Sequence, residues 1–267
     1  MNAQKDLQPD PASTPASTPG GTADATAAAT HAQQHHVAGL YRELAKLPPW
    51  LRKTAGESRW PVTAGVVTVI ILQLVLPDRY ALHPRYLLPL LEVALLLGLI
   101  AANPVRFQRE HPIVRWGSLA MTVLIALANF GSIIRLINQI IRHTAAQAPV
   151  DAVTLLGSAL AIWVTNILVF SLFYWEFDRG GPFARADARK PYADFLYPQM
   201  TDPSKAHPDW EPTFVDYFYL SFTNSTAFSP TDTMPMSSWA KLTMMLQSAV
   251  SLVTIALVAA RAVNILT

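Results

Sequence analysis

The sequence contains no cysteine and few charged residues, and both shortages restrict what the chain can be. Without cysteine it has no disulfide, no thiolate metal ligand and no cysteine nucleophile. Charged residues make up 14% of the 267 residues, whereas about a quarter is usual in a soluble domain. The formal net charge is only +2, so no polybasic surface points to nucleic acid as a partner. The composition favours an integral membrane protein whose main partner is the lipid bilayer.

Motifs of the common enzyme classes are also missing. The chain has no P-loop, no glycine-rich dinucleotide turn and no HExxH zinc motif. An intramembrane enzyme needs a buried His/Asp/Glu cluster or a Ser/Lys pair, and the sequence suggests neither. His83, His111, His143 and His207 are scattered without metal-ligand spacing. We therefore expect no enzymatic activity, no cofactor and no metal site.

The first sixty residues contain no long apolar run. Residues 1–36 are rich in Ala, Thr, Pro, Ser and Gln, a composition that cannot bury enough apolar surface to fold, so we expect a disordered tail. Residues 37–60 differ, because Leu40, Leu44 and Leu47 share one helical face and basic residues lie between them. This pattern predicts an amphipathic segment in the membrane interface.

Five apolar segments follow, and a helix of about 20 apolar residues crosses a bilayer core. The sequence predicts an all-α integral membrane protein with about five transmembrane helices, and the region 61–141 forms a three-helix bundle. We expect a multi-pass protein of the plasma membrane, in a bacterium the inner membrane. The five segments are 61–77, 86–102, 116–140, 152–175 and 240–266.

Two ionisable residues lie inside these apolar segments. Glu92 is in the second segment and Arg135 in the third, at similar depths if the two helices are antiparallel neighbours. Ionisable groups at such depth are costly and usually paired. We expect Glu92 and Arg135 to form an intramembrane ion pair, either as a structural contact or as part of an ion path. Asn129 and Asn166 are expected to form hydrogen bonds between helices.

A connection of about 60 residues separates the fourth and fifth apolar segments, which is long enough to suggest a function. Its carboxylates either attract cations to a vestibule or solvate the loop.

The connection ends in "FTNSTAFSPTD", residues 222–232. Asp216 can cap a short helix over 217–224. A polar, irregular segment and a final apolar helix follow. Irregular backbone at membrane depth is tolerated where it is buried in protein or lines water, and pore filters are built in this way.

This stretch resembles the pore-loop module of the potassium-channel superfamily. Ser221 and Phe222 match the Ser-Phe of the family's pore helix, and Thr226 matches the first filter threonine. Asp232 matches the aspartate after the filter, and Pro235 the proline beyond it. The chain is also similar to uncharacterised bacterial integral membrane proteins with such an ending. The resemblance implies a pore module over 150–267 in a homotetramer, with an outer helix, a pore helix over 214–225, a filter-like loop over 226–232 and an inner helix over 238–266.

The filter-like loop departs from the family at its centre. Ser229 and Thr231 replace the two filter glycines, and Pro230 replaces the tyrosine. Ser and Thr resist positive φ, and proline fixes φ near −65°, so the loop should not form the potassium cage of four carbonyl rings. The resemblance makes the candidate filter residues Thr226, Ala227, Phe228, Ser229, Pro230, Thr231 and Asp232.

Three interpretations of the loop stay open. It can be a pore of other selectivity, in which hydroxyl groups and a ring of Asp232 contact monovalent cations. It can be a remnant that holds subunits together, or the match can be chance. In the last helix Gln247, Ser251 and Thr254 share one polar face, either as pore lining or as packing between helices. We expect an ion channel subunit that is not selective for potassium; the alternative is a non-conducting membrane scaffold or assembly protein.

The basic residues predict an orientation that disagrees with this resemblance. With five spans, the N-terminal residues and the long connection share one side of the membrane. That side carries most of the Lys and Arg, and the positive-inside rule places it in the cytoplasm, whereas potassium channels insert the pore loop from outside. A span is miscounted, or the module is inverted as in ionotropic glutamate receptors, or the resemblance misleads. The N-terminal basic residues are Arg42, Lys46, Arg52, Lys53 and Arg59, against Arg79, Arg85 and Arg142 on the other side.

Overall fold

The computed structural model describes residues 47–102, 112–141, 152–226 and 232–266. The chain divides into residues 1–47 and residues 48–267, and the account below concerns the second unit. The tail expected over 1–36 lies outside the described residues. So do residues 227–231, the central part of the filter-like loop.

Five apolar helices make up most of this unit, close to the segments expected from the sequence. Three of them, within α4, α5 and α9, are long and apolar enough to cross a membrane, and α2 and α3 are shorter apolar helices. The three long helices indicate a multi-pass membrane protein. The bounds are α2 Trp60–Val75, α3 Leu87–Ala102, α4 Pro112–Ile141, α5 Ala152–Phe177 and α9 Ser238–Leu266.

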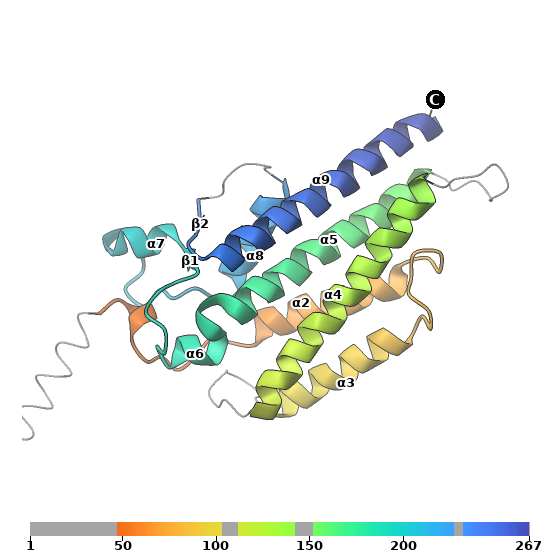
Figure 1. Cartoon of the computed structure of the whole chain (residues 1–267). Helices are drawn as coiled ribbons and strands as arrows, with labels where there is room; N and C mark the ends of the chain where they lie inside the picture. The colour runs from red at the N-terminus through yellow and green to blue at the C-terminus, as the bar shows by residue number, and fades with distance from the viewer. Residues whose placement is uncertain (1–46, 103–111, 142–151, 227–231, 267) are drawn as a thin grey trace, which may run out of the picture. The chain divides into compact units, whose positions relative to one another are not determined.

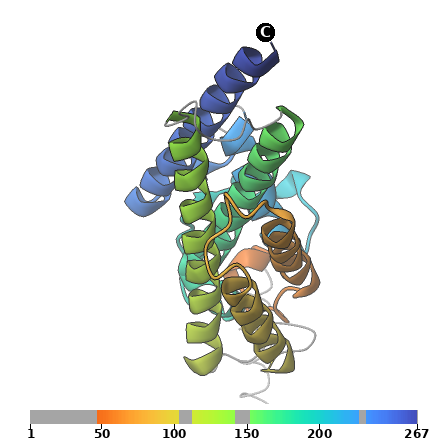
Figure 2. The same cartoon turned by 90° about the vertical axis from the view of Figure 1, so that its right-hand side faces the viewer.

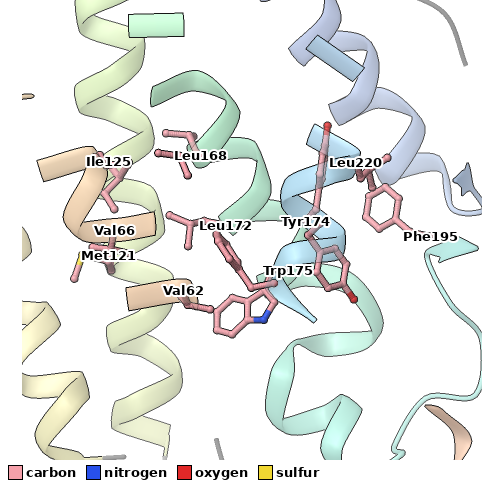
Figure 3. Close-up of a cluster of buried hydrophobic side chains, with 14 of the residues drawn as sticks. Val62, Val66, Met121, Ile125, Leu168, Leu172, Tyr174, Trp175, Phe195 and Leu220 are labelled. Carbon is pink, nitrogen blue, oxygen red and sulfur yellow. The ribbon is translucent and has the colours of Figure 1, made fainter. Parts of the chain in front are cut away.

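The helix α5 is the common packing partner in this unit. It packs against α2, α4 and α9, and α3 packs against α2 and α4 (Figure 1). The view turned by 90° shows α4 and α5 running past each other (Figure 2). Side chains from three helices meet between them, and Val66 of α2, Ile125 of α4 and Leu172 of α5 point toward one another (Figure 3). Lipid is as apolar as these side chains, so the hydrophobic effect does not drive the helices together in a membrane. Close packing of the buried side chains stabilises their association instead.

A compact polar-rich connection joins α5 to the final helices. It contains short helices and one two-residue strand, β1 (Phe195–Leu196), which pairs antiparallel with β2 (Met234–Pro235) just before α9. Phe195 lies opposite Pro235. This strand pair is a departure from the all-α expectation within a mostly helical structure. The short helices are η2 Asp178–Gly180, α6 Pro182–Ala186, α7 Pro198–Thr201 and η3 Pro203–Lys205.

The segment before α2 is docked on this connection and is mostly not helical. Within 47–59 the helical part is η1 (Pro49–Leu51), which has Pro48 as its N-cap and Pro49 as its first residue. Trp50 is buried and its ring lies 5.9 Å from that of Trp210, edge to face. The amide of Thr54 donates a 2.9 Å hydrogen bond to the carbonyl of Ala186. The described part of the expected amphipathic segment therefore contacts protein, and Leu40 and Leu44 lie outside it.

The short helix expected before the filter-like loop is present as α8 (Phe214–Thr226). It begins earlier than Tyr217, so Asp216 is its third residue and not its cap. The Asp216 carboxylate instead accepts hydrogen bonds from the backbone N–H and the hydroxyl of Thr213, at 2.8 and 2.9 Å. This is one half of a capping box, in which an acidic third residue accepts the N–H of the residue that precedes the helix.

Candidate functional site around α8

The helix α8 packs between α5 and α9, and polar contacts fix it to both. The hydroxyl of Ser221 donates a 2.7 Å hydrogen bond to the carbonyl of Ile167 on α5. Ser248 of α9 donates to the carbonyl of Asn224, at 3.1 Å. Apolar contact adds to these bonds, since Leu220 belongs to the same buried cluster as Tyr174 and Phe195 (Figure 3). The position of α8 is therefore set by directional bonds as well as by packing.

Gln247 of α9 is the centre of a buried hydrogen-bond network, the Gln247 network, with Tyr174, Ser221, Asn224, Ser225 and Ser248. Its Nε2 donates to the hydroxyls of Ser221 and Ser225, at 2.6 and 2.7 Å, and to the carbonyl of Ser221 at 3.0 Å. Its Oε1 accepts from the hydroxyl of Tyr174 at 2.7 Å and from Nδ2 of Asn224 at 2.9 Å. One side chain thus connects α9, α8 and α5.

The Gln247 network is costly to disturb, because Gln247 is 0% exposed and both ends of its amide are bonded. A buried polar group that loses its partner costs about 1–3 kcal/mol, and several partners here depend on one amide. A satisfied network of this kind specifies one arrangement of its helices. We infer that it holds α8 in one register against α9.

A second group, the Glu57 cluster, holds the start of α8 and consists of Glu57, Trp175, Asp178, Arg185 and Tyr217. Oε2 of Glu57 accepts a 2.9 Å hydrogen bond from the backbone N–H of Phe214, the first residue of α8. Its Oε1 accepts from Nε1 of Trp175 and from Arg185, whose Nη2 lies 3.0 Å away. A carboxylate at this place satisfies an end N–H group and complements the helix dipole.

Burial and charge act in opposite directions on Glu57. Burial raises the pKa of the Glu57 carboxyl above its usual value, and the Arg185 guanidinium together with the hydrogen bonds lowers it in part. Arg185 is itself buried and also donates to the carbonyls of Trp175 and Asp178, at 2.6 and 3.1 Å. With these bonds the guanidinium balances the buried carboxylate.

Asp178 and Asp194 link the Glu57 cluster to the start of α9. The hydroxyl of Tyr217 on α8 donates a 2.5 Å hydrogen bond to Asp178, which also accepts from the backbone N–H of Asp194 at 2.9 Å. Asp194 in turn accepts a 2.9 Å hydrogen bond from Nε1 of Trp239. Burial raises the pKa of the Tyr217 phenol well above its usual range, so the phenol stays a neutral donor. The helices α8 and α9 are therefore both bonded to the linked pair Asp178 and Asp194.

A glycine turn allows α5 to end beside α4. Gly181 has φ of +95°, and a Cβ there would lie 2.8 Å from the carbonyl oxygen of Glu176. The Arg115 guanidinium of α4 occupies the same space, where it pairs with the Glu176 carboxylate and donates to the Glu176 carbonyl at 3.2 Å. A residue without Cβ is required here by both conformation and space.

The candidate filter residues at the two ends of the loop lie at the protein surface. Thr226 is the last residue of α8, is exposed, and donates its hydroxyl back to the carbonyl of Phe222 at 3.0 Å. Asp232 is exposed just before β2. Ala227, Phe228, Ser229, Pro230 and Thr231 lie outside the described residues, so their role stays a prediction.

The three candidate pore-lining residues all face the interior of the single chain. Gln247 and Ser251 are 0% exposed, and Thr254 is 4% exposed. Gln247 bonds to α8, and Thr254 donates to the carbonyl of Val250 at 2.7 Å. The hydroxyl of Ser251 has no hydrogen-bonding partner among the described residues. The outward face of α9 is apolar and includes Leu242, Met245, Leu246, Leu252 and Val253.

Glu92 and Arg135 each contact a different partner. Oε1 of Glu92 accepts a 3.1 Å hydrogen bond from Nε2 of Gln73, and Arg135 donates to the carbonyl of Ala81. The expected ion pair between them is not among the ion pairs of the described residues. Glu92 therefore bonds to a residue of α2, and Arg135 bonds to the segment that follows α2. Asn129 and Asn166, in contrast, form the expected interhelical bond, at 3.3 Å.

Sequence reasoning missed the Glu57 cluster. Glu57 lies in the segment 37–60, which the sequence predicts to be interfacial, and Asp178 is one of the carboxylates of the long connection, for which the sequence predicts a vestibule or a solvated loop. Asp178 is buried and so is its neighbour Glu176, whereas Asp209 in the same connection is exposed. The available signal was that Asp178 follows directly on an aromatic, apolar helix end. Among the described residues no group of three or more His, Cys, Asp and Glu is placed to hold a metal ion.

Comparisons with known proteins assign no relatives to this arrangement. No protein-family model, no curated protein and no solved structure matches the chain.

Proposed function

We propose that this chain is a subunit of a membrane ion channel and that residues 226–232 form part of its pore. The observation that carries the proposal is the placement of α8, a short helix fixed between α5 and α9. In the sequence α8 is followed by a polar segment, then by β2 and α9. The Gln247 network and the Glu57 cluster hold both ends of α8. A polar loop between two fixed helices is the arrangement that a selectivity filter requires.

The oligomer follows from the size of the module. A single α5–α8–α9 unit encloses no pore, so we propose a homotetramer. Apolar surface is available for such contacts, because α8 exposes Val215, Phe218, Tyr219 and Phe222 along one face. The spacing of these residues, three and four apart, makes that face continuous.

The composition of the loop supports selectivity other than that for potassium. Hydroxyl groups of Thr226, Ser229 and Thr231 and the carboxylate of Asp232 offer oxygen atoms for monovalent cations. A ring of carboxylates near a pore entrance concentrates cations. We propose cation conduction with weak discrimination between monovalent cations.

A non-conducting scaffold is the second candidate, and one observation favours it. The polar face of α9 is used inside the chain, since Gln247, Ser251 and Thr254 are all buried, and the outward face is apolar. A pore lined by α9 alone would therefore be apolar. In this alternative α8 serves assembly, and the loop contacts other subunits instead of ions.

Current through reconstituted protein separates the two candidates. The full chain is placed in planar bilayers, and currents are recorded in sodium and in potassium salts for wild type, Asp232→Asn and Asp209→Asn. The channel proposal predicts cation currents that Asp232→Asn reduces several-fold. Asp209→Asn is the control, because this exposed carboxylate lies in the connection, where it pairs with Arg52 at 3.3 Å. Absence of current in wild type at every voltage would support the scaffold.

A further inference from the structure

Glu92 is a buried carboxyl with too few partners to be an anion. It lies on α3, is 0% exposed, and is the only charged residue of that helix. Its Oε1 accepts one hydrogen bond, from the neutral amide of Gln73, and its Oε2 has no partner among the described residues. Burying an ionised carboxylate with a single neutral donor is strongly unfavourable, and such a group takes up a proton instead.

Arg135 and Arg85, two cations at this end of the bundle, bond to other groups. Helix α2 contributes no charged side chain, and α4 contributes Arg135, which donates to the carbonyl of Ala81. In the segment between α2 and α3, Arg85 pairs with Asp78 and donates to the carbonyl of Leu74 at 2.6 Å. The remaining titratable residues of that segment are Arg79, Tyr80, His83 and Tyr86. Among the described residues, no ion pair reaches Glu92.

We propose that Glu92 is a proton-binding site, which carries a proton as the neutral acid in the folded protein at neutral pH. A hydronium ion gives the proton: one of its O–H bonds breaks and leaves water, while an O–H bond forms on the carboxylate and its negative charge is neutralised. The acid then has an O–H group to donate, and the carboxamide of Gln73 has a carbonyl oxygen that can accept it. Gln73 is the positioning residue, because it already donates to the other oxygen of the same carboxyl at 3.1 Å.

A small cavity offers a route for this proton. Its volume is about 20 Å³, room for about one water molecule, and it is lined by Gln73, Arg85 and Ser132 among others. Its lining includes Ala81 and Arg85 of the segment between α2 and α3, and Gln73, whose amide bonds Glu92. A water molecule in this cavity would contact Gln73, the partner of Glu92. This site does not depend on whether the protein conducts ions.

Carbodiimide labelling tests the protonation state. Dicyclohexylcarbodiimide enters membranes and adds to the protonated carboxyl, whose proton moves to a carbodiimide nitrogen as the new C–O bond forms. The adduct then rearranges to a stable acylurea that mass spectrometry locates. The full chain in liposomes should be labelled at Glu92 at neutral pH, more slowly as the pH rises, and not in Glu92→Gln. Glu176→Gln is the matched control, since Glu176 is buried but paired with Arg115, and it should leave the labelling unchanged.

Infrared spectroscopy provides a second measurement that does not depend on access of the reagent. Wild type at neutral pH should show the carbonyl band of a protonated carboxyl, and Glu92→Gln should lack it. Gln73→Leu should retain a band at shifted frequency, because the acid loses its amide partner. Identical carboxyl bands in wild type and Glu92→Gln, or labelling that persists in Glu92→Gln, would overturn the proposal. Neither result would bear on the current measurements that test the channel.

Discussion

Arg185 and Glu57 form a buried ion pair across 128 residues of sequence, with Nη2 and Oε1 separated by 3.0 Å. The pair connects the segment before the first apolar helix to the long connection before the last. Because Glu57 also accepts the first N–H of α8, one carboxylate determines where α8 begins. The start of α8 is therefore held by a residue far outside the region that resembles a pore module.

Replacing Arg185 alone should destabilise the protein more than replacing both residues of the pair. Arg185→Met leaves the Glu57 charge buried, which typically costs about 3–5 kcal/mol, whereas the double variant Arg185→Met/Glu57→Gln keeps a neutral acceptor for the Phe214 N–H. We expect a large fall in thermal unfolding temperature in detergent for the single variant and partial recovery for the double variant. A double variant less stable than the single one would contradict this account.

The same single variant should respond to pH in a definite direction. Burial already raises the pKa of Glu57, and loss of Arg185 removes the main opposing charge, so the folded protein binds this proton more tightly than the unfolded chain. A raised carboxyl pKa gives stability that is present at low pH and is lost as the pH rises through the folded value. The unfolding temperature of Arg185→Met, measured relative to the double variant, should thus rise as the pH is lowered from neutral. A fall in this relative unfolding temperature as the pH is lowered would contradict the prediction.

Two neighbouring positions on α9 should differ sharply in their response to loss of polarity. Gln247→Leu removes the partner of several buried groups and should destabilise by more than about 2 kcal/mol. Ser251→Ala, one helical turn away and equally buried, removes a hydroxyl without a partner among the described residues and should be neutral or slightly stabilising. Thermal unfolding of both variants provides the comparison. Equal effects would mean that the Gln247 network does not hold α8.

The turn after α5 should not tolerate a side chain. Gly181→Ala places a Cβ against the Glu176 carbonyl at φ of +95°, and backbone strain of this kind costs about 1–3 kcal/mol before the displacement of Arg115 is added. Gly157→Ala is the control, because nothing lies within 4 Å of a Cβ there and alanine favours helix. Expression level and unfolding temperature should fall for the first variant alone.

The absence of native cysteine makes single-cysteine mapping of the membrane topology direct. Three apolar helices lie between Arg79 and Tyr192, which are both exposed, so five spans put them on opposite sides. Arg79→Cys and Tyr192→Cys should react with an impermeant maleimide from opposite sides of intact cells and inverted vesicles. Labelling of both variants from the same side would mean that fewer than five helices cross the membrane. The side that Tyr192→Cys faces decides between the orientation predicted by the basic residues and that of a potassium channel.

The helices could be predicted from the sequence because they depend on local patterns. The apolar segments gave bounds within a few residues, and the short helix predicted over 217–224 lies within α8, although Asp216 is not its cap. The Asn129–Asn166 bond followed because polar side chains in apolar helices seek each other. Each of these inferences needed only neighbouring residues or two adjacent helices.

The polar contacts could not be predicted, because they join residues that are distant in sequence. Glu92 and Arg135 have opposite charges and were expected at the same depth in the membrane. Depth alone does not determine which way each helix is rotated. In the fold Glu92 faces Gln73 instead. The polar stripe of Gln247 and Thr254 indicated a special face, and the same pattern fits a pore or a buried neighbour. Only the packing of α9 against α5 and α8 shows that this face is turned inward.

The oligomeric state of the purified full chain tests the central claim most directly, since one subunit cannot enclose a pore. Native mass spectrometry from detergent, repeated over a range of protein concentrations, should give a complex of four copies. Val215→Lys and Phe222→Lys on the exposed face of α8 should dissociate it, whereas Tyr192→Lys in the connection should not. A wild-type protein that is a monomer at every concentration would contradict the proposed shared pore.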